Sequence, residues 1–508
     1  MSTNLPLTHE LGGVMARMTM RSMAAFAVAA TMMMVAASCS GDDETNDPAA
    51  STNATTAASA APESTAPGDE DDPAAEPEST ATTVDSAAVA GPGYESGDDD
   101  YLFDQEQMHT FEINLPEASL AELDADPAAE EYVEGSLTFK GETIEPVGVR
   151  YKGSIGAFIG CVDGPDPFTP SGAKTCTKLS LKLKMNWSDP DTEFYGVRTV
   201  QLHSLNFDPT LMHERLGYWM FREMGVPAPR STHARVMVNG EYVGVFALTE
   251  AIDGRFARAN FDDGTGNIYK EIWPLDPAGA AQTVETFIGG LETNKDEPSA
   301  DIISAFATEL AAAVPEDRVA VLDRWTDLET LLTTIVVDRA IRNDDGPLHW
   351  YCFGPCAPHN FFWYEDPSTL KMTLIPWDFD LTFDSVEPNS TAGPVIAIAD
   401  PWGEISDDCE PFTSGSFGLQ QKSAACDPLL GSLATLDDDF QRIRADLLAG
   451  PFSEERIDAQ LAAWTEQIES SVAEAADLID DAPSVARWES NLERLTQAIT
   501  KSRNGDGR

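Results

Sequence analysis

The sequence is poor in basic residues. Its 508 residues contain 32 Lys and Arg against 86 Asp and Glu, which gives a formal net charge of -54. Because binding to a phosphate backbone requires a basic surface, this deficit argues against nucleic acid as a partner. Beyond the N-terminus the sequence also lacks an apolar run of about 18 residues, which argues against a polytopic membrane protein. The hydrophobic fraction of 42% is still large enough for a substantial core.

The N-terminal segment has the features of an export signal. Arg17 and Arg21 precede an apolar stretch over residues 23–35, and small residues lead directly to Cys39. A basic region, a short apolar core and small residues are typical of a cleaved signal. Because the cysteine resembles the lipobox of bacterial lipoproteins, we expect Cys39 to carry lipid and to anchor an exported protein to the cell membrane. An ordinary signal peptide with an incidental cysteine is the alternative.

A basic-free segment follows the expected signal peptide. Residues 40–100 contain no Lys, Arg or His and are rich in Ala, Ser, Thr, Pro and acidic residues. Such a segment buries too little apolar surface to offset the entropy of ordering, so we expect a disordered linker. The expected organisation is therefore a signal peptide over 1–39, this linker, a globular domain over 101–400, and a loop-rich and helical region over 401–508.

Six cysteines follow Cys39, and none of them forms the C-x2-C pair of a zinc site. An even number of cysteines in an exported protein favours disulfides. Many pairings are compatible with six cysteines. The simplest joins sequence neighbours, namely Cys161 with Cys176, Cys352 with Cys356, and Cys409 with Cys426.

Hydrophobic periodicity predicts an α+β fold with a strand-rich first half and a helix-rich second half. Residues 177–186 alternate strictly, so this segment is predicted to be a strand with apolar side chains on one face. Asn239-Gly240 between two alternating runs predicts a β-hairpin. Asp208 before a helical apolar pattern predicts a helix through Met224. Helical spacing also covers residues 301–313, 326–342 and most of 432–502.

Two acidic residues follow the short apolar strand predicted at 372–376. If the strand continues, Asp378 and Asp380 point the same way, which suits Mg2+ bound together with phosphate. A turn with solvated acids is the alternative, although the apolar neighbours Trp377 and Phe379 argue against it.

A second acidic pair, Asp344 and Asp345, follows the helix predicted at 326–342, and Asn360 comes later. An acid, an asparagine and an acid in this order are used in metal-assisted phosphoryl transfer, in which one Asp orients the acceptor hydroxyl and the others bind the metal. A helix-capping Asp and a turn Asn would explain each residue separately.

Basic residues gather upstream on two predicted strands: Arg150, Lys152, Lys178, Lys182 and Lys184. They form either a phosphate-binding surface that faces the acids or a solvated strand face that balances nearby acidic charge.

Together these segments resemble the CotH kinase family. The matching segments, in the family's order, are VGVRYKGSIG (147–156), TKLSLKLKMN (177–186), FYGVRTVQLHS (194–204), DPTLMHERLGYWMFREMGVPAPR (208–230), VMVNGEYVGVFALTEAID (236–253), GNIYK (266–270), HNFFWY (359–364) and LIPWDFDLTF (374–383). The resemblance implies an atypical protein-kinase-like bilobal fold with a helical C-terminal extension. It also implies ATP, Mg2+ or Mn2+, and transfer of phosphate to Ser or Thr of a protein substrate.

The resemblance also implies roles for individual residues. Asp345, with Asp344 as the adjacent alternative, matches the catalytic aspartate, and Asp378 matches the metal-binding aspartate, with Asn360 and Asp380 as further metal ligands. The family places the asparagine five residues after the catalytic aspartate, whereas an insertion that contains Cys352 and Cys356 separates them here. A disulfide-closed loop would bring Asn360 back to Asp345.

By analogy with kinases, we expect three further contacts with the nucleotide. Lys178 would bind the phosphates and pair with Glu214, Arg150 would contribute to the phosphate site, and Glu250 would lie near the adenine-binding hinge.

Two other interpretations remain open. Residues 378–382 also resemble the D-x-D-x-T motif of haloacid-dehalogenase phosphatases, but the expected βα repeats do not follow. The insertion and the linker favour a different class, a catalytically inactive kinase-like surface scaffold or adhesion protein.

Overall fold

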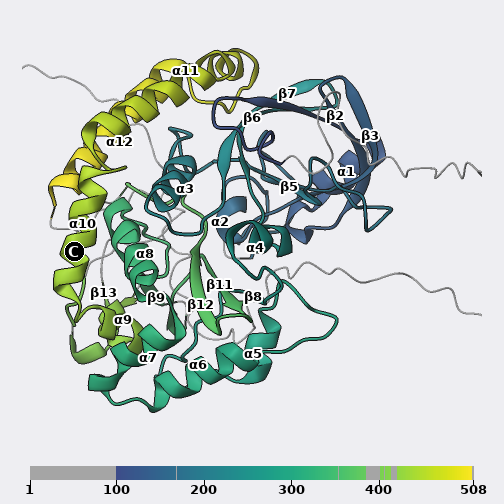
Figure 1. Ribbon diagram of the computed structural model, residues 1–508. Coiled ribbons are helices and arrows are strands. Elements are labelled where there is room, and N and C mark those ends of the chain that lie inside the picture. The colour runs from purple at the N-terminus through teal and green to yellow at the C-terminus, as the bar shows by residue number, and fades with distance from the viewer. Residues whose placement is uncertain are drawn as a thin grey trace, which may run out of the picture. The chain divides into compact units, whose positions relative to one another are not determined.

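The computed structural model describes residues 99–166, 169–352, 354–384, 401–405, 407–413 and 420–505 (Figure 1). The expected signal peptide, Cys39 and nearly all of the expected linker lie outside the described residues. Within these ranges no helix is both long and apolar enough to cross a membrane.

The first half of the described chain forms a closed β-barrel with the strand order β1-β2-β3-β4-β5-β7-β6. The strands are β1 (His109–Asn114), β2 (Val133–Phe139), β3 (Glu142–Tyr151), β4 (Leu181–Lys184), β5 (Thr199–His203), β6 (Ser231–Val238) and β7 (Glu241–Thr249). The apolar face predicted over 177–186 is confirmed, because Leu179, Leu181, Leu183 and Met185 all lie in the barrel core, but the strand itself is shorter than predicted and covers only Leu181–Lys184. The predicted hairpin at Asn239-Gly240 is also confirmed, since it joins β6 to β7.

Short helices accompany the barrel: α1 (Glu117–Ala125), α2 (Ile155–Phe158), α3 (His213–Glu223) and α4 (Gly254–Asn260). Helix α3 begins later than predicted. The Asp208 carboxylate accepts the backbone N–H groups of Thr210 (2.8 Å) and His213 (2.7 Å), so these residues form a turn that leads into the helix.

A second core contains a three-stranded sheet and most of the helices. The sheet has the order β12-β11-β8, from β8 (Ile268–Lys270), β11 (Phe361–Asp366) and β12 (Lys371–Pro376). The helices before residue 400 are α5 (Val284–Gly289), α6 (Asp301–Ala312), α7 (Arg318–Trp325) and α8 (Leu328–Ile341). Figure 1 shows the sheet between α3 and the helices α5 to α7.

The C-terminal helices belong to the same core. They are α9 (Pro428–Leu433), α10 (Asp437–Ala449), α11 (Glu454–Leu478) and α12 (Val485–Asn504). The core cluster that contains Leu216 of α3 extends to Trp464 of α11 and Ile499 of α12. Residues 420–505 are therefore packed into the body of the protein.

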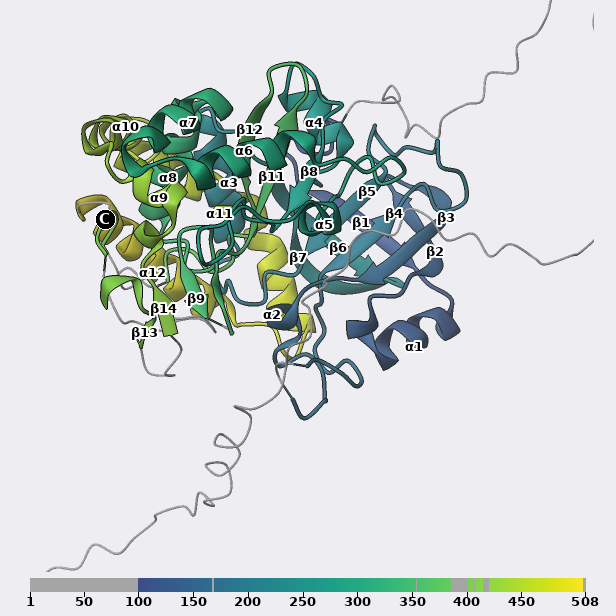
Figure 2. The same ribbon diagram turned by 90° about the horizontal axis from the view of Figure 1, so that it is seen from below.

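A small sheet with the order β10-β9-β14-β13 completes the fold (Figure 2). Its strands are β9 (Trp350–Cys352), β10 (Cys356–Ala357), β13 (Phe412–Thr413) and β14 (Gln420–Lys422). The three predicted disulfide pairings, 161–176, 352–356 and 409–426, are confirmed. Mostly antiparallel strands form the barrel and most of the helices belong to the second core, so the predicted α+β class is confirmed as well.

Candidate functional site

The acidic segment after β12 is fixed against helix α3. Asp378 has a positive φ of 57°, and its backbone N–H donates to the Tyr218 hydroxyl oxygen at 3.1 Å. The next residue, Phe379, is fully buried and stacks on Phe221 with a centroid distance of 5.2 Å. A Cβ at Gly217 would lie 2.7 Å from the Phe379 ring, so the close approach requires glycine there. The strand end and α3 thus position the predicted acids together.

Asp345 lies beside this segment and is hydrogen-bonded through both carboxylate oxygens. The Tyr351 hydroxyl donates to Oδ1 at 2.5 Å, and the Asn360 amide donates to Oδ2 at 2.9 Å. The same amide nitrogen lies 2.9 Å from the Asp345 carbonyl oxygen, and the Asn360 backbone N–H donates to Glu271 Oε1 at 3.0 Å. Asn360 therefore lies against Asp345 despite the insertion.

Burial and neighbouring negative charges raise the pKa values of Asp345, Asp378 and Asp380. Burial, followed by the charges of Asp378 and Glu271, raises the pKa of Asp345 to about 7. Burial and the charge of Glu214 also raise the pKa of Asp378. The pKa of Asp380 lies well above its ordinary value because of burial and the charges of Asp378 and Asp345. Carboxylates whose ionised forms are disfavoured in this way are typical of sites that bind a cation or transfer a proton.

The amine that faces these acids is that of Lys152, at the end of β3. Its Nζ donates to Gln201 Oε1 at 2.9 Å, is hydrogen-bonded to His203 Nε2 at 2.7 Å, and lies over the Trp377 ring at 5.3 Å. The pKa of Lys152 is lowered to about 7, mainly by burial. The charges of Lys182 and Lys270 lower it further, whereas the charge of Asp378 opposes the shift.

Glu214 reaches this amine through a histidine. His203 Nε2 lies 2.7 Å from Lys152 Nζ, and His203 Nδ1 lies 2.7 Å from Glu214 Oε1, so the imidazole bridges the amine and the carboxylate. The Thr249 hydroxyl donates to the same oxygen at 2.5 Å. Burial alone would raise the pKa of Glu214, but these partners and the Lys152 charge hold that pKa below its ordinary value.

Lys178 does not meet Glu214, although the kinase analogy predicts that pair. Its Nζ donates to the Val245 carbonyl oxygen at 2.7 Å and lies over the Phe246 ring at 5.1 Å. Strand β4 begins only at Leu181, so strand alternation does not direct the Lys178 side chain. The lysine that reaches Glu214, through His203, is Lys152.

Arg150 and Glu250, which were expected to bind the nucleotide, each have protein partners. Arg150 is 6% exposed and pairs with Glu130 at 2.5 Å. Glu250 accepts two hydrogen bonds from the Arg230 guanidinium at 3.0 Å each and one from Arg255. Both residues are therefore held by charged partners within the protein.

Sequence reasoning assigned no role to four residues that the structure places around the acids: His203, Lys270, Glu271 and Tyr351. Two of them could have been found from the sequence, since His203 and Lys270 lie within the family-matching segments FYGVRTVQLHS and GNIYK. Nothing in the sequence pointed to Glu271 and Tyr351. Asp344, the alternative to Asp345, is 3% exposed, and its backbone N–H donates to the Leu381 carbonyl at 3.2 Å.

The donor set fits a hard divalent cation. Asp378 and Asp380 offer carboxylate oxygens that are buried and have raised pKa values, and Asn360 offers an amide oxygen. Among the described residues no three His, Cys, Asp or Glu side chains form a ready cluster for a metal ion. Two carboxylates and an amide oxygen suit Mg2+, which is commonly bound by one or two carboxylates together with substrate phosphates.

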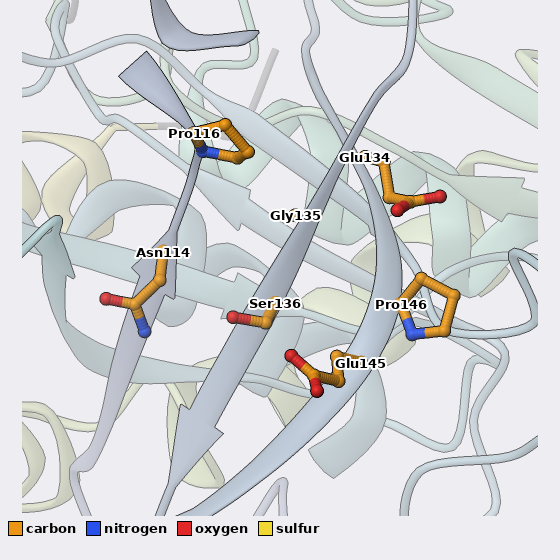
Figure 3. A pocket seen from close by; sticks show the side chains of 7 residues that line it. All are labelled: Asn114, Pro116, Glu134, Gly135, Ser136, Glu145 and Pro146. Atoms are coloured by element: carbon orange, nitrogen blue, oxygen red, sulfur yellow. The ribbon is translucent and has the colours of Figure 1, made fainter. Parts of the chain in front are cut away.

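A separate hollow of about 520 Å3 lies on the barrel strands (Figure 3). Its lining consists of Asn114, Pro116, Glu134, Gly135, Ser136, Glu145 and Pro146. None of these residues belongs to the acid and lysine group, so the hollow is not part of the candidate site.

The fold and site define an α+β protein with buried carboxylates that face a buried amine. Residues 149–504 match the family model described as CotH kinase protein, and the chain therefore belongs to the CotH kinase family. The match runs from β3 into α12 and includes the C-terminal helices.

Two curated proteins illustrate the relationship. The chain is 24% identical over 197 residues to inner spore coat protein H of Bacillus subtilis (strain 168), across 37% of this chain and 51% of that protein. It is 26% identical over 217 residues to invasin CotH2 of Rhizopus delemar, across 40% of this chain and 35% of that protein. The chain thus spans about half, or less, of the length of these relatives.

Proposed function

We propose that the chain is an exported, membrane-tethered CotH-type kinase that transfers phosphate from ATP to Ser or Thr of a surface or secreted protein. The observation that carries this proposal is the assembly of Asp345, Asn360 and Asp378 opposite Lys152, with Asp380 at the same place. These residues come from distant segments of the chain, and separate structural roles would not require them to meet.

Each residue has a chemical role in this proposal. Asp345 accepts the proton of the acceptor hydroxyl, for which a pKa of about 7 is well matched at neutral pH. Asp378, Asp380 and Asn360 would hold Mg2+ or Mn2+, which neutralises phosphate charge when bound. Lys152 donates to the phosphates, and Glu214 orients it through His203.

The arrangement also supports a kinase-like division into two lobes. The barrel supplies Lys152, and the second core supplies the acids through β12 and the segment after α8. The segment with Glu250 joins the barrel to α4, which is the place expected for a hinge. In this reading Glu250 shapes the hinge through its arginine partners rather than by contact with adenine.

Export is supported by three disulfides and by the N-terminal sequence. Disulfides persist mainly in oxidising compartments outside the cytosol. The names of the relatives, a spore coat protein and an invasin, are consistent with a surface location. We propose that lipid on Cys39 tethers the protein to the membrane.

A second candidate function is a catalytically inactive surface scaffold or adhesion protein. The observations that favour it are the inserted β9–β10 hairpin in the catalytic segment and the similarity to an invasin. A scaffold of this kind would keep the fold without metal-dependent ATP binding.

Calorimetry of ATP binding separates the two functions. The full chain, produced under disulfide-forming conditions, is titrated with ATP in the presence and absence of Mg2+ and Mn2+. The kinase predicts metal-dependent binding that Asp378→Asn abolishes, whereas Asp438→Asn, an exposed acid of α10, leaves it intact. Absence of binding to the folded wild-type chain would support the scaffold.

A further inference from the structure

The small sheet β10-β9-β14-β13 lies directly beside the Asp345 segment. Two of the three disulfides close it: Cys352–Cys356 joins β9 to β10, and Cys409–Cys426 joins the residues that flank β13 and β14. Figure 2 shows β9, β13 and β14 together at one end of the molecule. A sheet of strands only two or three residues long has few ladder hydrogen bonds of its own, so covalent closure matters for its persistence.

Tyr351 is the central residue of this sheet. It pairs with Ala357 of β10 on one side and with Gln421 of β14 on the other. Its ring stacks on His359 with a centroid distance of 4.3 Å. Tyr351 also forms a small apolar cluster with Leu381, which directly follows Asp380. These contacts hold a ring that is 6% exposed, and they fix the direction of its hydroxyl group.

The two side-chain donors to Asp345 lie on either side of the disulfide loop, one in β9 and the other between β10 and β11. Tyr351 precedes the disulfide loop and donates to Oδ1, whereas Asn360 follows the loop and donates to Oδ2. With both oxygens engaged, the carboxylate is restricted to one rotamer. The insertion that separates Asp345 from Asn360 therefore helps to hold the Asp345 carboxylate in place. We call the pair of hydrogen bonds from Tyr351 and Asn360 the clamp.

We propose that Tyr351 is a positioning residue for Asp345, held in place by the two disulfides of the small sheet. The proposal rests on the proposed kinase function and extends it. Reduction of each disulfide by a dithiol adds two electrons and two protons, giving two cysteine thiols while the dithiol becomes a disulfide. The loosened sheet then no longer fixes Asp345, so phosphate transfer depends on an oxidising compartment.

Steady-state kinetics of Tyr351→Phe test the positioning role. We expect kcat to fall by roughly ten- to a hundredfold, because a misplaced base lowers the rate of transfer, while KM for ATP stays unchanged. Tyr242→Phe is the matched control, since it also removes one buried hydroxyl hydrogen bond, to the Ser471 carbonyl oxygen at 2.9 Å, and should leave kcat unchanged. An unchanged kcat in Tyr351→Phe, or an equal loss in both variants, overturns the proposal.

Hydrogen exchange tests the clamp whether or not the chain transfers phosphate. The backbone N–H groups of Asp344, Gly346 and His349 are hydrogen-bonded within the protein. We expect their exchange to accelerate in Tyr351→Phe and in the double variant C352S/C356S, but not in C161S/C176S, which removes the disulfide of the barrel. Unchanged exchange in the first two variants overturns the inference. An inactive wild-type chain would instead count against the proposed function alone.

Discussion

The buried carboxylates of Glu250 and Asp378 differ in the charges that surround them. Burial would raise the pKa of Glu250, but hydrogen bonds and charges from Arg230 and Arg255 hold it below its ordinary value. Burial also raises the pKa of Asp378, and Glu214 raises it further, while His203 and Lys152 offset only part of this effect. One carboxylate is stabilised as an anion within the protein, and the other is not.

On the proposed function, this contrast separates a structural acid, Glu250, from a functional one, Asp378. An acid whose partners all belong to the protein contributes to the stability of the fold. An acid that is buried next to other acids is costly for the fold, and such sites are commonly retained for binding or catalysis. Substitutions at the two positions should therefore have opposite effects on stability and function.

The largest expected effect is loss of phosphate transfer in Asp345→Asn and Asp378→Asn. Removal of a general base or of a metal ligand should lower kcat by about a hundredfold to ten-thousandfold. Because each change removes one charge from a cluster of like charges, the melting temperature of Asp378→Asn should rise above that of the wild type. Kinetics and differential scanning calorimetry measure both effects, and a lower melting temperature with retained transfer would contradict the comparison.

Lys152→Met and Lys178→Met should differ in ATP affinity. Loss of the amine of Lys152 removes charged hydrogen bonds to phosphate worth about 1.5–3 kcal/mol, or roughly ten- to a hundredfold in Kd. Lys178, whose amine bonds to the Val245 carbonyl, should affect stability instead. Titration calorimetry measures both, and a greater loss of affinity in Lys178→Met would restore the assignment suggested by the kinase analogy.

Glu250→Gln should destabilise the fold without changing ATP affinity. Two arginines lose their buried partner, and breaking such a pair typically lowers the free energy of unfolding by about 3 kcal/mol. Denaturant unfolding checks this value against Glu455→Gln, an exposed position of α11 that should be neutral. A stable Glu250→Gln that no longer binds ATP would move Glu250 back into the nucleotide site.

The smallest expected effect is a pH dependence of ATP affinity. Lys152 has a pKa of about 7 in the free protein, so it is charged below pH 7 and increasingly neutral above it. Above pH 7, Lys152 must take up a proton when ATP binds. ATP affinity should therefore decline by up to about tenfold per pH unit, until the pH reaches the pKa of Lys152 in the ATP-bound state. Lys152→Arg stays charged and should show a flatter profile in the same titrations, whereas a wild-type profile that is flat from pH 6 to 9 would contradict this assignment.

The sequence predicted the placement of the acidic side chains better than that of the basic ones. Asp378 and Asp345 lie beside elements with clear periodicity, so their positions followed from the order of elements. Lys178 lies outside the regular part of its strand, where alternation no longer indicates direction. Its assignment to Glu214 rested on analogy alone, and the structure places Lys152 there through His203.

The arginine partners of Glu250 could not be predicted from the sequence pattern either. Counting back from the Asn239-Gly240 turn without interruption would place Glu250 opposite Pro229. A bulge between Val236 and Met237 shifts the register by one residue, so Ser231 pairs with Thr249 and Arg230 comes next to Glu250. Periodicity does not reveal a bulge. The sequence also led us to expect that a disulfide-closed loop would bring Asn360 back to Asp345, but it did not indicate the contact between Tyr351 of the inserted hairpin and Asp345.

The most direct test of the central claim is calorimetric titration of the oxidised full chain with ATP, with and without Mg2+. The account predicts metal-dependent binding that Asp378→Asn abolishes and Glu250→Gln preserves. Binding that survives in Asp378→Asn and is lost in Glu250→Gln would show that the structural and functional carboxylates have been assigned the wrong way round.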